Sequence, residues 1–273
     1  MKPPIFSTLA IALDQGIADV CLNRPDKSNA IDAVMWQEIR QAFEWIDRTP
    51  SVRVAILSGA GKNFCAGIDL SMLGSIQQQI ADPDGARSRE KLRRLILDLQ
   101  DCLSSIERCR KPVIAAIQGA CVGGGLDLVA CCDMRYASAD AVFSIKEIDL
   151  GMIADVGTLQ RLPSLIGQGL TRELAYTGRN VDAAEAEKIG LINRFFAANN
   201  ELTVTIRELA QSIAAKSPLA TRGLKEIMNF SRDHSVADGL NHVATWNAAL
   251  LLSADMNECF AAQREKRQPR FED

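Results

Sequence analysis

The first 150 residues alternate between short apolar segments typical of β-strands and longer segments with helical spacing. Residues 7–25 (STLAIALDQGIADVCLNRP) predict two strands joined at a turn over 14–16, residues 32–48 a helix, and residues 52–61 (VRVAILSGAG) a buried strand. The rhythm repeats with a helix over 89–109, a strand over 111–120 and strands over 133–144. Because parallel strands need crossover helices, this alternation predicts an α/β fold with a mostly parallel sheet.

From Gly157 onward the pattern is helical, ending in the segments 201–216, 218–231 and 236–253. The stretch from Ser75 to Glu90 (SIQQQIADPDGARSRE) is polar and rich in turn residues, so we expect a mobile loop there. No internal repeat of fixed period is present. The chain therefore predicts one domain with a helical appendage.

The charge balance argues for a small-molecule substrate. Lys plus Arg number 31 against 34 Asp plus Glu, a net charge of -3 that gives nucleic acid no electrostatic attraction. No apolar run approaches the length of a membrane span. Eight cysteines lack any metal-type spacing and indicate buried, reduced thiols. With neither a leader-like start nor a peroxisomal tripeptide at the end, we expect a cytoplasmic protein.

Two glycine-containing strand ends are candidate binding loops, 58–70 (SGAGKNFCAGIDL) and 118–128 (QGACVGGGLDL). Neither matches a nucleotide-binding fingerprint. Three consecutive glycines that open a helix bring backbone N–H groups close to a ligand, with the positive end of the helix dipole behind them. A second such loop supplies another donor, and two donors aimed at one point form an oxyanion hole. The alternative is that the glycines only permit tight turns.

The segment 144–157 (SIKEIDLGMIADVG) holds acids in apolar surroundings. Glu147, Asp149 and Asp155 lie among seven apolar side chains, where carboxylates are costly unless they have partners or a chemical role. Asp149 is expected to pair with a neighbouring base. Glu147 and Asp155 are candidates for proton transfer.

Several motifs in a fixed order resemble the crotonase (enoyl-CoA hydratase/isomerase) superfamily. They are NRPDKSNAID, GKNFCAGIDL, KPVIAAIQGACVGGGLDL, FSIKEIDLGMIADVGTLQRLP, ELAYTGRNVDAAEAEKIGLIN and KRQPRF, and they extend over nearly the whole chain. The resemblance implies a ClpP/crotonase-like spiral of ββα units with two roughly perpendicular sheets over residues 1–197. It also implies a C-terminal helical trimerisation region over residues 198–273, and a homotrimer or a hexamer built from two trimers.

The resemblance also implies an acyl-CoA substrate and no cofactor or metal beyond the coenzyme A of that substrate. The backbone N–H groups of Ala66 and Gly124 are the implied oxyanion donors. Residues 66–70 are expected to line the thioester; they are Ala66, Gly67, Ile68, Asp69 and Leu70. Lys266 resembles a lysine that reaches the coenzyme A of a neighbouring subunit.

Three acids point to one branch of this family. Asp127, Glu147 and Asp155 match the spacing of the dienoyl-CoA isomerases, whereas a hydratase-like chain would carry Glu, Glu and a small residue there. Conversion of a 3,5-dienoyl-CoA to a 2,4-dienoyl-CoA removes a proton from carbon 2 and adds one at carbon 6. A proton-transfer group must lie within roughly 3 Å of its target, so one carboxylate does not easily serve both carbons.

We therefore assign Glu147 as the base at carbon 2, Asp155 as the acid at carbon 6, and Asp127 as a third acid that tunes or holds Glu147. Asp155 must start protonated, which its apolar neighbours and an ionised Glu147 both favour. This chemistry serves the β-oxidation of unsaturated fatty acids.

Structural alternatives remain open at each position. Asp127 fits the first turn of a helix, Glu147 could pair with Lys146 or Arg161, and Asp155 could be the N-cap of the next helix. Two other functions also remain open: an enoyl-CoA hydratase or another crotonase reaction, and a non-catalytic acyl-CoA- or RNA-binding protein.

Overall fold

A computed structural model describes residues 2–273 and contains a six-stranded sheet at its centre. The strand order is β1-β2-β3-β4-β6-β9, with β1 and β2 antiparallel and every later neighbour parallel. The strands are β1 (Leu9–Asp14), β2 (Ile17–Leu22), β3 (Val54–Gly59), β4 (Val113–Ile117), β6 (Met134–Ser138) and β9 (Arg194–Phe196). The predicted hairpin and the mostly parallel sheet are thus confirmed.

A second sheet has three strands in the order β5-β7-β8. Along the chain, these strands lie in the connections between β4, β6 and β9 of the large sheet. The strands of the second sheet are β5 (Ala120–Val122), β7 (Val142–Ser144) and β8 (Val181–Asp182). The short helices beside it are α4 (Gly124–Ala130), α5 (Thr158–Ile166), α6 (Gln168–Thr177) and α7 (Ala183–Lys188), with single 3-10 turns η1 (Pro25–Lys27) and η2 (Glu147–Leu150). Two short loops join β4 to β5 and β5 to α4, so the two sheets meet near residues 118–124.

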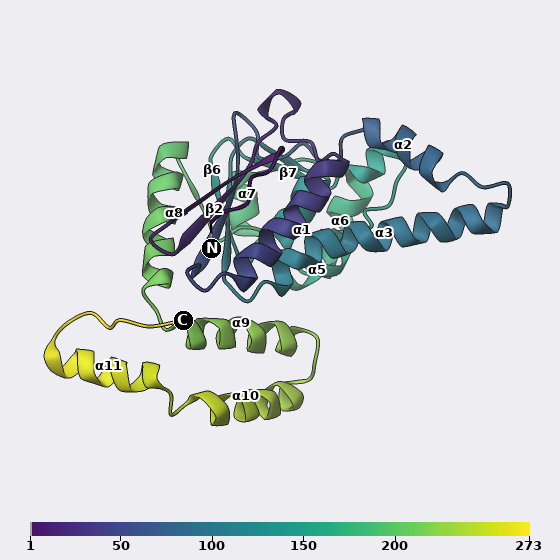
Figure 1. Cartoon of the computed structure of the whole chain (residues 1–273). Helices are drawn as coiled ribbons and strands as arrows, with labels where there is room; N and C mark the ends of the chain where they lie inside the picture. Colours follow the sequence, from purple (N-terminus) through teal and green to yellow (C-terminus); the bar gives the residue numbers. More distant parts are fainter. Residues whose placement is uncertain (1) are drawn as a thin grey trace.

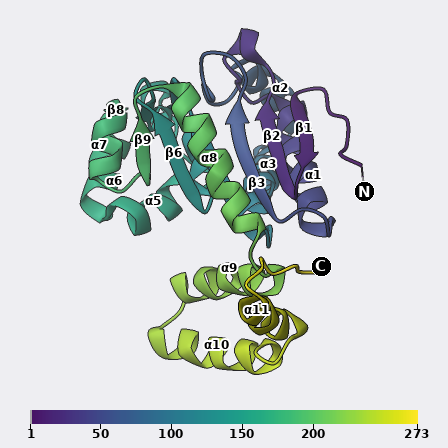
Figure 2. The ribbon, with the colours of Figure 1, turned by 90° about the vertical axis from the view of Figure 1, so that its left-hand side faces the viewer.

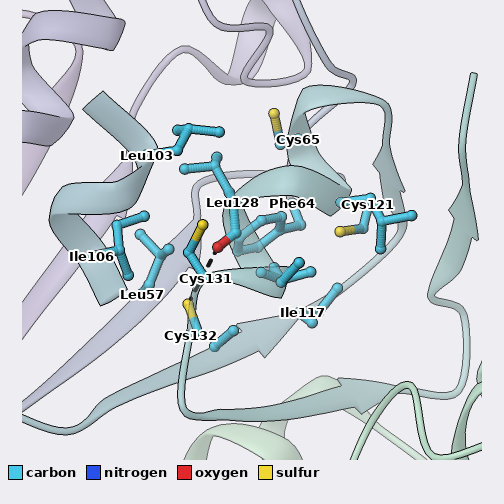
Figure 3. Packing of buried hydrophobic residues seen from close by; sticks show 14 of the residues in the cluster. Leu57, Phe64, Cys65, Leu103, Ile106, Ile117, Cys121, Leu128, Cys131 and Cys132 are labelled. Atoms are coloured by element: carbon cyan, nitrogen blue, oxygen red, sulfur yellow. Dashed lines mark hydrogen bonds between the residues drawn. The ribbon is translucent and has the colours of Figure 1, made fainter. Parts of the chain in front are cut away.

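Long helices cover both faces of the large sheet (Figures 1 and 2). On one face α1 (Ala33–Arg48) packs against α3 (Gly85–Arg108), and on the other α8 (Asn199–Ala214) packs across β3, β4, β6 and β9. The main core contains many aliphatic, aromatic and thiol side chains, and Figure 3 shows Phe64, Leu128 and four of its six cysteines. A smaller cluster lies beneath α8 and includes Ile56, Ile114 and Ile206.

All eight cysteines are free thiols. Six of them are buried as predicted, but Cys21 is half-buried and Cys259 is exposed. Within residues 2–273, no helix is both long and apolar enough to cross a bilayer.

Three C-terminal helices form a separate layer, seen below the body in Figures 1 and 2: α9 (Pro218–Arg232), α10 (Val236–Leu250) and α11 (Ala254–Glu265). The sequence-based boundary at residue 197 assigned α8 to this region. In the structure α8 instead belongs with the large sheet, because Leu202, Ile206 and Ala210 are buried against it. The layer that stands apart begins at α9.

The prediction of a loop over residues 75–90 is wrong. Residues 71–80 form α2 (Ser71–Ile80), and α3 begins at Gly85 after a turn of only four residues. Met72 is buried against the core, and the Asp84 side chain caps α3 by accepting the Ala86 N–H at 2.8 Å. These two interactions favour helix on both sides of a segment whose composition indicates a loop.

Lys225 fastens the C-terminal layer to the body. Its ammonium group is almost fully buried and donates to Asp133 Oδ2 at 2.7 Å and to the Lys111 carbonyl at 3.1 Å. Lys225→Met is expected to lower the free energy of unfolding by about 3 kcal/mol, because it leaves a partly buried carboxylate without its cation. Urea unfolding measures the loss.

Lys91→Met is the matched control, since the Lys91–Asp82 pair is at the surface and should contribute far less to stability. Equal losses from the two substitutions would contradict an anchoring role for Lys225.

Candidate active site

The site begins where two loops meet. The loop after β3 pairs with β5 through a parallel bridge between Cys65 and Cys121, and with the chain before α1 through a bridge between Ile31 and Ile68. β5 leads directly into the glycines that open α4. The two glycine loops expected to act together therefore lie against each other.

Two backbone amides lie side by side at this contact. A β-carbon built on Gly124 would lie 3.6 Å from the Ile68 nitrogen, and one built on Gly67 would lie 3.5 Å from the Gly124 nitrogen. Within residues 2–273, neither the Ile68 nor the Gly124 N–H donates a hydrogen bond. Two unpaired N–H groups on neighbouring loops can bind one anionic oxygen.

The prediction that the Ala66 N–H is one of the two oxyanion donors is wrong. Its N–H already donates to the Ser28 carbonyl at 2.9 Å. The Ile31 N–H donates to the Gly67 carbonyl at 2.8 Å, and because N–H and C=O point in opposite directions across a trans peptide, the Ile68 N–H faces away from Ile31. The donor is therefore two residues further along the loop than the motif implied.

Glu147 lies over the same glycines. Its Oε1 would be 3.2 Å from a β-carbon on Gly123, whose φ of +53° is a conformation that favours glycine. The other oxygen, Oε2, is buried and has no hydrogen-bond partner within residues 2–273. Burial raises the pKa of this carboxyl, and the nearby Asp155 carboxylate raises it further. A carboxyl in this position is suited to accept a proton from a ligand on the amide pair.

The proposed ion pairs for Glu147 are absent among residues 2–273. Lys146 instead pairs with Asp149 at 3.0 Å, which confirms Asp149 as a structural acid. Arg161 pairs with Glu107 at 2.9 Å.

Asp127, in the first turn of α4, is completely buried. Its Oδ1 accepts the Thr158 N–H at 2.6 Å, while Oδ2 has no hydrogen-bond partner within residues 2–273. Burial raises the pKa of Asp127 to about 7 against the lowering effect of the Thr158 hydrogen bond, and Glu147 and Asp155 raise it by smaller amounts. The three acids thus form one electrostatic cluster.

Asp155 lies at the edge of this cluster. The N-cap of α5 is Gly157, without a side-chain hydrogen bond, so the alternative that Asp155 caps that helix is wrong. Asp155 borders a polar cavity of about 360 Å³ together with Gln100 and Ser104, and Gln100 donates to the Asp155 carbonyl at 2.6 Å. The side chain reaches solvent, yet the atoms packed around the carboxyl still raise its pKa. The sequence did not single out Gln100, because its contact with Asp155 joins segments 55 residues apart.

The remaining predicted substrate-binding residues have different surroundings. Asp69 forms an ion pair with Arg24 at 3.0 Å and bonds to Ser71, while Leu70 is exposed at the start of α2. Lys266 is exposed at the end of α11, and α11 lies in the helical layer that stands apart from the body (Figure 1). Within one chain Lys266 therefore does not join the other candidate residues.

Comparison with known proteins gives consistent results. Residues 12–273 match the enoyl-CoA hydratase/isomerase family. The chain is 49% identical to a peroxisomal Δ(3,5)-Δ(2,4)-dienoyl-CoA isomerase from Arabidopsis thaliana, with 94% of this chain and 93% of that protein covered. It is 46% identical to the mitochondrial Δ(3,5)-Δ(2,4)-dienoyl-CoA isomerase from Homo sapiens, with 92% and 77% covered.

Solved structures share the fold. An enoyl-CoA hydratase from Bacillus anthracis superposes with a TM-score of 0.88 at 30% identity, covering 97% of this chain and 99% of the other. The expected crotonase fold is confirmed.

The expectation of a cytoplasmic protein is contradicted by these comparisons. The similar isomerases are named as peroxisomal in Arabidopsis thaliana and as mitochondrial in Homo sapiens and Dictyostelium discoideum. The expectation rested only on the terminal residues of the chain, and the comparisons take precedence over it.

The raised pKa of Asp127 has a consequence for stability. A carboxyl with a raised folded-state pKa adds stability below its unfolded pKa of 3.8, and this contribution is lost as the pH rises through about 7. The free energy of unfolding of the wild-type protein relative to Asp127→Asn should therefore fall between pH 4 and pH 8. Urea titrations across this range measure the difference, and a constant or rising difference would contradict the assignment.

Proposed function

Because the chain belongs to the enoyl-CoA hydratase/isomerase family, we propose that it converts 3,5-dienoyl-CoA to 2,4-dienoyl-CoA in the β-oxidation of unsaturated fatty acids. One observation carries the proposal beyond the family. Glu147 lies beside the free amide pair and its carboxyl interacts electrostatically with those of Asp127 and Asp155, and none of the three has a Lys or Arg partner within residues 2–273.

The thioester oxygen would accept hydrogen bonds from the Ile68 and Gly124 N–H groups. Glu147 then removes a proton from carbon 2, and the negative charge spreads through the dienolate onto that oxygen. The amides stabilise this charge more strongly than the neutral carbonyl, so the interaction lowers the barrier. This oxyanion hole replaces the pair Ala66 and Gly124 implied by the motifs.

Asp155 would donate the proton to carbon 6 as the double bonds shift. Its raised pKa favours the protonated form that donation requires. After one turnover Glu147 is protonated and Asp155 is ionised. The polar cavity beside Asp155 gives water a route to this acid. The cycle closes when Asp155 regains a proton from water and Glu147 releases its own, so no net proton is consumed.

Asp127 would keep the cluster short of full ionisation. Asp127 is fully buried beside two other carboxyls, and each charge in such a cluster disfavours the next, so full ionisation of all three is opposed. Proton transfer is the only chemistry required, so we propose that the enzyme needs no cofactor besides the coenzyme A of its substrate.

We further propose a homotrimer or a dimer of trimers assembled through α9–α11. These helices and the turn between α10 and α11 expose many large apolar side chains, including Leu224, Val236, Leu240 and Leu252, and enclose an apolar groove of about 400 Å³. Such a surface is typical of contacts between copies of a chain. Assembly would also bring Lys266 toward the coenzyme A of another subunit.

Asp155→Asn is expected to reduce turnover of a 3,5-dienoyl-CoA by at least about a hundredfold, because carbon 6 loses its proton donor. Ultraviolet absorbance follows the conjugated product, and a 2-enoyl-CoA assayed in parallel tests for hydration.

Asp149→Asn is the matched control, since Asp149 pairs with Lys146 and should be dispensable. Isomerisation that survives in Asp155→Asn would refute the two-acid mechanism. Hydration of the 2-enoyl-CoA without isomerisation would identify a hydratase instead.

The double variant Leu240→Glu, Leu252→Glu should dissociate the assembly, because it places charges on two exposed apolar positions of the C-terminal layer. Light scattering coupled to gel filtration measures the mass. The control Leu97→Glu changes an exposed leucine on α3 and should leave the mass unchanged. A wild-type monomer would contradict the proposed oligomer.

A further inference from the structure

Cys65 makes contacts that the other buried cysteines lack. Its side chain is completely buried, and Sγ donates to the Asn29 carbonyl at 3.2 Å while it accepts the Gly67 N–H at 3.4 Å. Burial raises the pKa of the thiol to about 12, so the proton that it donates remains in place at neutral pH. The thiol thus bridges two segments 36 residues apart at the start of the loop that carries Ile68.

The backbone of Cys65 joins this loop to the second glycine loop. The Cys65 N–H donates to the Ala120 carbonyl at 2.9 Å, and the Val122 N–H donates to the Cys65 carbonyl at 3.1 Å. Ala120 and Val122 are the first and last residues of β5, which ends two residues before Gly124. A displacement of Cys65 would therefore be transmitted to both amide donors.

The first turn of α4 packs directly on Cys65. A β-carbon built on Gly125 would lie 2.6 Å from the Cys65 carbonyl oxygen and 2.9 Å from its Cβ. The helix that begins with Gly124 approaches this closely only because residue 125 has no side chain. Cys65 is consequently in contact with Gly67 and Gly125, the residues next to the two amide donors.

The Cys65 thiol also provides the second of two hydrogen bonds that hold the backbone of Gly67. The Ile31 N–H holds the Gly67 carbonyl at 2.8 Å and so sets the direction of the Ile68 N–H. The thiol holds the nitrogen of the same residue from its other side. With both ends of Gly67 bonded, the Ile68 N–H has little freedom to turn away from Gly124.

We propose that Cys65 is a positioning residue that uses its thiol to hold the Ile68 amide in register with the Gly124 amide. The inference rests on the proposed function, because it assigns these amides to the thioester oxygen. Cys121 offers a direct comparison: it is equally buried across the same bridge, but its thiol makes no hydrogen bond within residues 2–273 (Figure 3).

The test compares Cys65→Ala, Cys65→Ser and Cys121→Ala. Cys65→Ala should lower kcat about tenfold with little change in KM, since a misplaced donor weakens binding of the developing oxyanion more than binding of substrate. Cys65→Ser should restore most of kcat, because a hydroxyl both donates and accepts. Cys121→Ala creates a similar cavity and should retain kcat.

A second readout separates this inference from the reaction itself. The carbonyl stretching frequency of an enzyme-bound 2,4-dienoyl-CoA labelled with ¹³C at carbon 1 reports hydrogen bonding to the thioester oxygen without turnover. Cys65→Ala should reduce the shift to lower frequency that the wild-type protein produces, and Cys65→Ser and Cys121→Ala should keep it. A wild-type protein that shifts the carbonyl but does not isomerise would refute the proposed function alone.

The inference is overturned if Cys65→Ala keeps both the wild-type kcat and the wild-type carbonyl shift. It is also overturned if Cys121→Ala loses as much of each as Cys65→Ala does. Should the alanine variant fail to fold, Cys65→Val fills the space without hydrogen bonds and carries the same expectations.

Discussion

The site depends on the parallel contact between the loop after β3 and the loop that opens α4. The Cys65–Cys121 bridge holds these loops together, and as a result the Ile68 and Gly124 amides are neighbours with no partner in residues 2–273. A ligand oxygen placed between these two N–H groups could accept hydrogen bonds from both.

Charge is distributed around the amide pair in a way that suits proton transfer. Arg161 is the basic residue nearest to Asp155 along the chain, and Glu107 neutralises it. Lys146, next to Glu147, is held by Asp149. Without a cation in the cluster, the pKa values of Asp127, Glu147 and Asp155 are all raised, chiefly by burial, so these carboxyls bind protons more tightly than isolated carboxyls do.

Local patterns in the sequence predicted the hairpin and the mostly parallel sheet correctly, because each depends on spacing within one segment. They also singled out Asp127, Glu147 and Asp155, whose catalytic roles are proposed. The direction of a backbone N–H, in contrast, depends on contacts with segments that are distant along the chain. Whether the Ala66 or the Ile68 N–H faces the ligand depends on bonds to Ser28 and Ile31, far away along the chain, and on Gly67 between them, whose φ of +93° departs from an extended backbone.

The same limit explains two other differences. Asp155 looked like a helix cap because it precedes α5, but the Thr158 N–H is taken by Asp127, 31 residues earlier. Residues 75–80 looked like a loop because they are polar, yet Met72 at the start of α2 is buried against the core. Composition reports the tendency of a segment, and tertiary contacts decide its state.

The central claim is that two different carboxyls act at the two ends of the substrate. Nuclear magnetic resonance of 3,5-dienoyl-CoA in deuterated water with Asp155→Asn tests it most directly. The account expects deuterium to enter carbon 2, because Glu147 still removes and returns that proton, while no 2,4-dienoyl-CoA accumulates. Two results would contradict it. One is that the variant loses both the exchange at carbon 2 and the isomerisation, and the other is that it still isomerises the substrate and places deuterium at carbon 6.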